Sequence, residues 1–127
     1  MPHLIVEYSA NLDSVVDFQT VVEALRAAAA ETGVFPLGGI RARAHRCTHV
    51  AMADGAPEHG FVDVTLRIGK GRDEAVRQRA GDYIFAALSK ALDPAFAATT
   101  VALSFQLEEL QGLSWKRNTV HDALDRA

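Results

Sequence analysis

The sequence has little sulfur and no membrane-spanning signal. Its one cysteine, Cys47, can form neither an internal disulfide nor a thiolate metal site by itself. No segment is long and apolar enough to cross a bilayer, and no basic stretch followed by an apolar core marks a secretory signal. The formal net charge is −3, so no excess of basic residues indicates binding to nucleic acid or to a membrane surface. We therefore expect a cytoplasmic protein without structural metal.

The composition that remains is typical of a folded domain. Hydrophobic residues make up 49% of the 127 residues and charged residues 23%. A chain of this length buries roughly two thirds of the surface that it exposes when unfolded. We interpret residues 1–127 as one domain with internal repeats at about residues 2–50 and 60–110 and a tail at residues 111–127.

The first repeat reads as strand, helix and strand. Residues 3–9 alternate, with Leu4, Val6 and Tyr8 on one face. Residues 15–32 carry an apolar stripe at helical spacing, and residues 40–50 alternate again. The predicted stripe consists of Phe18, Val21, Val22, Leu25, Ala28 and Ala29, and one face of the second strand consists of Arg41, Arg43, His45, Cys47 and His49.

The second repeat follows a turn-rich connection, MADGAPEHG, and has the same order of elements. A strand is predicted over residues 61–68, and a helix runs from about residue 74 until Pro94 ends it. The last strand carries Val101, Leu103, Phe105 and Leu107 on one face, and the tail has weak helical character.

Two β-α-β repeats predict an α+β fold with a four-stranded mixed sheet and both helices on one face. The other face would then be bare in a monomer. We expect it to carry too many apolar residues for contact with water, and therefore to be covered in an oligomer. A ferredoxin-like monomer has the same pattern of elements, so the pattern alone does not decide between the two.

The first strand opens on Pro2, although proline cannot donate a hydrogen bond to a sheet. Proline is tolerated at the first position of a strand, which is an ordinary structural explanation. A second interpretation is chemical: removal of Met1 would leave Pro2 as a terminal secondary amine that can take up a proton. Methionine aminopeptidases accept a small second residue such as proline, so we expect this removal.

Six segments carry a resemblance over nearly the whole chain: PHLIVEYS, TGVFPLGGIRARAH, MADG, FVDVTLRIGKGR, ALSFQLEEL and WKRNTVH. Together, and in this order, they resemble the 5-carboxymethyl-2-hydroxymuconate isomerase family of the tautomerase superfamily. The resemblance implies a cofactor-free isomerase that assembles as a homotrimer. Its substrate would be a carboxylate-rich muconate from bacterial homoprotocatechuate degradation. The reaction would be a 1,3-allylic proton transfer that turns a dienol into a conjugated ketone.

The resemblance also implies roles for three residues. Pro2 would be the general base, and Arg41 of GGIR and Arg72 of GKGR would bind substrate carboxylates. An α-amino group titrates near pH 8, and both burial and nearby arginines favour its neutral form, so a free base near neutral pH is physically reasonable. From the residues alone, Arg43 competes with Arg41, because the two lie on one strand face about 7 Å apart.

Other signals have ordinary explanations. On a strand, His45 and His49 would be roughly 13 Å apart, which is too far for one zinc ion, so we expect no metal. His3 and Cys47 are expected to pack rather than react, and Trp115 is expected to anchor the tail against a neighbouring subunit. Two other functions remain open: a keto–enol tautomerase of another 2-oxo or 2-hydroxy acid, and a non-catalytic trimeric binding protein.

Overall fold

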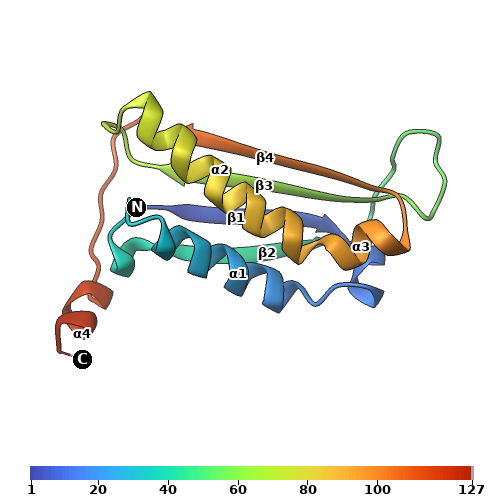
Figure 1. Ribbon diagram of the computed structural model, residues 1–127, viewed down its shortest axis with the longest axis horizontal. Coiled ribbons are helices and arrows are strands. Elements are labelled where there is room, and N and C mark those ends of the chain that lie inside the picture. The colour runs from blue at the N-terminus through green and yellow to red at the C-terminus, as the bar shows by residue number, and fades with distance from the viewer. Residues whose placement is uncertain (127) are drawn as a thin grey trace.

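Four strands form one mixed sheet in the order β2-β1-β3-β4 in the computed structural model, which describes residues 1–126 (Figure 1). β1 pairs with β2 and β3 with β4 in parallel, whereas β1 and β3 are antiparallel. β1 and β2 therefore begin at the same end of the sheet at which β3 and β4 finish. We call this the Pro2 end. The strands are β1 (His3–Ser9), β2 (Arg41–Cys47), β3 (Gly60–Ile68) and β4 (Val101–Glu109).

Two long helices, α1 (Phe18–Glu31) and α2 (Glu74–Ala91), cover the same face of the sheet (Figure 1). This confirms the predicted fold class. The predicted stripe of α1 is buried at all of its positions. The helix begins at Phe18, later than predicted, because the Asp17 side chain accepts a hydrogen bond from Gln19 N at 3.1 Å. Before it, residues 10–14 form a short 3-10 helix, η1 (Ala10–Ser14). No helix within residues 1–126 is both long and apolar enough to cross a membrane.

The prediction that Pro94 ends the second helix is wrong. α2 already ends at Ala91, and a separate short helix, α3 (Asp93–Ala98), follows it. Pro94 lies in the first turn of α3, where its missing N–H would have had no partner in the helix anyway. The residue therefore starts a helix instead of stopping one.

The core lies between the sheet and the two helices. The predicted inner faces of β1 and β3 are buried, and the Tyr8 ring stacks on Phe18 at 3.6 Å between centroids. The inner face of β4, at the edge of the sheet, is partly buried. The largest fully buried side chains are Leu4, Leu12, Leu25, Leu66, Ile68, Ile84, Leu88, Leu92, Val6, Val21, Val62 and Val64.

The helix-free face of the sheet differs from the prediction, because it is mainly polar. The strand registers place rows of side chains on it, and one row joins His45, Glu7, Asp63 and Ser104 across all four strands. The alternation that buries one face leaves arginines, acids and hydroxyls on the other. Apolar residues on this face therefore give no reason for oligomerisation.

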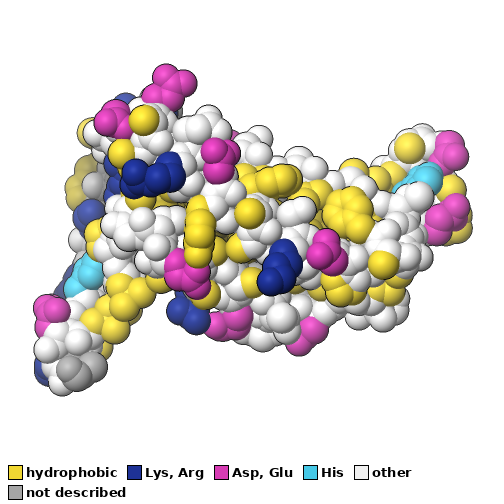
Figure 2. Space-filling model, viewed as in Figure 1, with side chains coloured by type: hydrophobic (Ala, Val, Ile, Leu, Met, Phe, Trp, Pro, Cys, Tyr) yellow, Lys and Arg dark blue, Asp and Glu magenta, His cyan; other side chains and the backbone are white. Residues whose placement is uncertain are grey.

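After β4 the chain leaves the sheet as an extended C-terminal arm, residues 110–126, which ends in α4 (Val120–Arg126) (Figure 1). Hydrophobic side chains gather along the arm (Figure 2). Leu113 and Trp115 are each 86% exposed. The arm is tied to the short helix η2 (Leu37–Gly39) by a hydrogen bond from Asn118 Nδ2 to Gly38 O at 2.9 Å.

Candidate functional site

The Pro2 end of the sheet brings together the three residues that the sequence analysis selected. Pro2 precedes β1, Arg41 is the first residue of β2, and Arg72 lies in the loop that joins β3 to α2. These residues are up to 70 positions apart in the chain. The mixed pairing of the strands accounts for their common location, because two strands start and two strands finish at the Pro2 end of the sheet.

Pro2 is buried and held by the backbone around it. Its carbonyl oxygen accepts a hydrogen bond from Arg41 N at 3.2 Å, which continues the β1–β2 ladder by one residue. Gly39 is its other close neighbour: a Cβ at this position would lie 3.5 Å from Pro2 Cδ. The GG sequence of η2 therefore brings the backbone close to the proline ring.

Arg41 and Arg72 are half-buried but weakly engaged. Arg41 donates from Nε to Gly39 O at 3.3 Å, and its Nη2 lies 3.9 Å from Met1 Sδ. Arg72 donates to two carbonyl oxygens, each at 3.5 Å, and its guanidinium lies 5.0 Å from the centroid of the Phe35 ring. Within residues 1–126 neither arginine forms an ion pair. Both charges therefore remain without an acidic counterion.

This charge acts on the chain terminus. Burial lowers the pKa of the Met1 amine below its usual value, and the cations of Lys116, Arg72 and Arg41 lower it further, in that order. The terminus thus lies in a positive field that favours its neutral form. Lys116 did not emerge from the sequence analysis, because it belongs to an arm without periodicity, although the segment WKRNTVH contains it.

His3 and Arg43 form a second polar pair on the helix-free face of the sheet. Arg43 Nη1 lies 3.1 Å from His3 Nδ1, so the neutral imidazole accepts a hydrogen bond there. Burial, followed by the charges of Arg41, Arg67 and Arg43, lowers the pKa of His3 to about 4. Arg43 is thereby engaged with His3, whereas Arg41 is one of the cations that lower the pKa of the Met1 amine.

Arg72 lies next to the start of α2, and free backbone N–H groups at a helix N-terminus favour an anion. The carboxylate of Asp73 caps this helix by accepting from Val76 N at 2.9 Å. A carboxylate of the chain itself thus already takes up one of the N–H groups at this helix end.

Two hollows flank the terminus. One, of about 530 Å³, is lined by Met1, Arg41 and residues of the C-terminal arm. The other, of about 280 Å³, lies between Met1, Arg67 and the arm. Pockets for small ligands usually measure about 300 to 1,000 Å³. The geometry therefore offers room for a small anion beside Met1.

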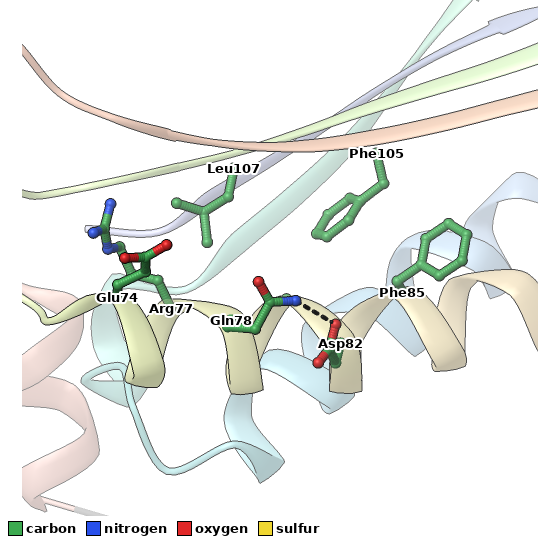
Figure 3. A pocket seen from close by; sticks show the side chains of 8 residues that line it. Glu74, Arg77, Gln78, Asp82, Phe85, Phe105 and Leu107 are labelled. Atoms are coloured by element: carbon green, nitrogen blue, oxygen red, sulfur yellow. Dashed lines mark hydrogen bonds between the residues drawn. The ribbon is translucent and has the colours of Figure 1, made fainter.

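A third hollow, of about 540 Å³, lies between α2 and β4, away from Pro2 (Figure 3). Phe85, Phe105 and Leu107 form its apolar side, and Gln78 and Asp82 are hydrogen-bonded to each other at its rim. Its one arginine, Arg77, pairs with Glu109 at 3.0 Å and is neutralised. None of the predicted site residues lines it.

The remaining candidates lie elsewhere. Within residues 1–126 no group of three or more metal-binding side chains comes together, and His49 lies beyond the end of β2. Cys47 is the last residue of β2 and lies at the end of the sheet opposite the Pro2 end. It lines a hollow with residues of the β2–β3 loop.

Comparison with known proteins gives a consistent assignment. The family model of 5-carboxymethyl-2-hydroxymuconate isomerase matches residues 2–124. A 5-carboxymethyl-2-hydroxymuconate Delta-isomerase of Escherichia coli is 39% identical over 122 residues, which cover 95% of this chain and 97% of the relative.

Solved structures agree with this assignment. A 5-carboxymethyl-2-hydroxymuconate isomerase from Deinococcus radiodurans R1 has a TM-score of 0.88 at 36% identity, covering 97% of this chain and 93% of its own. A second structure, of a 5-carboxymethyl-2-hydroxymuconate delta-isomerase, has a TM-score of 0.93 at 34% identity, covering 98% and 93%. The fold alone is shared with a fused 4-OT protein, at 18% identity, a TM-score of 0.56 and coverage of 88% and 93%.

Proposed function

Because this chain belongs to the 5-carboxymethyl-2-hydroxymuconate isomerase family, we propose that it isomerises 5-carboxymethyl-2-hydroxymuconate with Pro2 as general base and Arg41 and Arg72 as carboxylate ligands. The observation that carries the proposal is the arrangement at the Pro2 end of the sheet. A partly buried terminus, next to the buried Pro2, lies in the field of arginines that have no acidic partner within residues 1–126.

The reaction moves one proton and the double bonds of the substrate. The neutral proline nitrogen removes a proton from the dienol, which leaves a dienolate, and returns it to a different atom, which leaves a conjugated ketone. No redox change or external reactant is needed. A base is most effective when its pKa lies near the working pH. Burial and nearby cations lower the pKa of the Met1 amine, and removal of Met1 would leave the Pro2 amine beside the same cations.

Arginine suits the substrate because its planar guanidinium donates paired hydrogen bonds to a carboxylate and keeps its charge at any relevant pH. Arg41 and Arg72 make only long hydrogen bonds to neutral acceptors. Little hydrogen-bond energy is therefore lost when a substrate carboxylate replaces those acceptors. The same cations offset the negative charge that develops on the dienolate.

The role of Pro2 is tested by blocking its nitrogen. With any residue ahead of it, this nitrogen becomes an amide whose lone pair is delocalised, and it has no useful basicity. We would prepare two fusions, one cleaved to leave Pro2 at the terminus and one cleaved to leave a glycine ahead of it, and verify both by intact mass. The blocked chain should fold normally and lose at least about 100-fold in kcat for the muconate, measured by ultraviolet absorbance. Equal activity of the two preparations excludes Pro2 as the base.

We further propose that the protein is a homotrimer. The support is the fused 4-OT protein of the same fold, which is described as a symmetric trimer, together with the exposure of Leu113 and Trp115 on the arm. Sedimentation equilibrium should then give a mass near three times the 13.7 kDa of the chain. A monomer mass at micromolar concentration contradicts the proposal.

A further inference from the structure

Three cations act on the chain terminus, and only two of them were selected as substrate ligands. The charges that lower the pKa of the Met1 amine come from Lys116, Arg72 and Arg41, and Lys116 is the strongest of the three. Arg117, its neighbour in the chain, is not among them. The C-terminal arm thus brings one specific cation to the site.

The two hollows beside the terminus also show that Lys116 lies close to Met1. Lys116 lines both of them, together with Met1 and Trp115, so it lies where the two hollows meet. Arg117 lines only the larger hollow. The arm is held in this position from η2, where Asn118 donates to Gly38 O. In the single chain Lys116 is exposed, and it forms no ion pair within residues 1–126.

The topology explains how a tail residue reaches this site. β4 ends at the Pro2 end of the sheet, as β3 does, and the arm continues from there. Each of the four strands consequently supplies one residue at this end: Pro2 before β1, Arg41 at the start of β2, Arg72 after β3 and Lys116 after β4.

From this arrangement we infer that Lys116 binds the third carboxylate of the substrate and sets the preference for a tricarboxylate over a dicarboxylate. The inference rests on the proposed function. 5-Carboxymethyl-2-hydroxymuconate carries two carboxylates at the ends of its chain and a third on the carboxymethyl arm. Arg41 and Arg72 provide for two of them. An ammonium group on a long stem suits the third, because it can follow a flexible arm without the fixed geometry of a guanidinium.

The test compares two substrates that differ only in the carboxymethyl arm and its carboxylate: the tricarboxylate and 2-hydroxymuconate, which lacks this arm. Lys116→Met removes the charge and keeps most of the stem, and Lys90→Met, at an exposed lysine in the last turn of α2, is the matched control. Values of kcat/KM are taken from the plateau of the pH profile, so that a changed pKa of the amine does not affect the comparison. We expect Lys116→Met to lose about tenfold or more on the tricarboxylate and less than about threefold on 2-hydroxymuconate.

Three controls complete the design. Lys116→Arg should restore most of the lost preference, and Lys90→Met should leave both substrates within about threefold of the wild type. Equal losses on the two substrates, or no loss on either, overturn the inference.

A binding measurement separates this result from a failure of the proposed activity. Calorimetric titration with propane-1,2,3-tricarboxylate and with glutarate should show that Lys116→Met loses the wild-type preference for the tricarboxylate, whether or not the protein turns over a muconate. A preference retained in this variant refutes the role of Lys116.

Discussion

Replacing Arg72 with alanine should separate catalysis from stability. In the folded protein Arg72 makes two hydrogen bonds, both at the 3.5 Å limit, and one contact with the Phe35 ring at 5.0 Å. Such long bonds are worth well under 1 kcal/mol each, and a partly exposed cation–π contact is worth about 0.5–1 kcal/mol. The loss of folding stability should therefore stay near 1–2 kcal/mol, which is a fall in Tm of only several degrees for a domain of this size.

The loss in the reaction should be larger. A guanidinium that holds a carboxylate with charge-assisted hydrogen bonds contributes about 2–4 kcal/mol, or roughly 30- to 1,000-fold in kcat/KM. The assay follows muconate absorbance, with thermal unfolding measured on the same preparations. Arg72→Lys should recover part of the loss, since it restores the charge but not the paired donors. Arg79→Ala, an exposed arginine of α2, serves as the control for loss of charge alone. Wild-type kcat/KM in Arg72→Ala, or a fall in stability as large as the catalytic loss, would refute this role for Arg72.

Two further predictions concern the surroundings of the site. The pKa of His3 is lowered to about 4, so His3 is neutral in both states above pH 6.5, whereas between pH 6.5 and 4 only the unfolded chain takes up its proton. Folding stability should therefore fall as the pH falls through this interval. The Tm of His3→Gln should decrease less than the Tm of the wild type between pH 7 and 4. Parallel plots of Tm against pH for the two proteins would contradict the lowered pKa of His3. At Gly38 an added Cβ would lie 2.4 Å from His121 Nδ1, so Gly38→Ala should displace α4 and speed amide exchange in the C-terminal arm while leaving α1 unchanged. Exchange that rises equally in α1 would show that the arm is part of the cooperative core.

Much of the fold could be predicted because each element carries its own period. The stripe of α1 and the alternation of β1 and β3 follow directly from the spacing of apolar residues. Pro94 was misread because proline is compatible both with a stop after a helix and with the first turn of the next one. The character of the helix-free face was misjudged although its residues were visible, since Arg41 and Arg43 already stood on it.

The candidate site was predictable only in part. Pro2, Arg41 and Arg72 were carried over from motifs, and the structure brings them to one end of the sheet. Lys116 has no such signal, because its place depends on where β4 ends and on the hydrogen bond between Asn118 and Gly38. This hydrogen bond joins residues 80 positions apart, and one of them lies in an arm without periodicity. No local pattern encodes them.

The sheet consists of two parallel strand pairs joined antiparallel, so its two ends can be compared. The register pairs His3 with Arg41 in the first repeat and Gly60 with Val101 in the second, so the start of β3 corresponds to the start of β1. At that opposite end two basic side chains have a carboxylate partner. His59 contacts Asp54 at 2.8 Å, and Arg46 is bound to Asp13.

The two ends therefore differ in electrostatics more than in backbone. Cations without acidic partners within residues 1–126 gather beside Met1, where they favour a neutral amine and an anionic ligand. At the opposite end Asp13 neutralises Arg46, and the position that corresponds to Arg41 is the apolar Val101. Burying a charge without a partner is costly, so such an arrangement is maintained where a ligand supplies the counter-charge. The asymmetry therefore favours the Pro2 end, and not the opposite end, for the anion site that we propose.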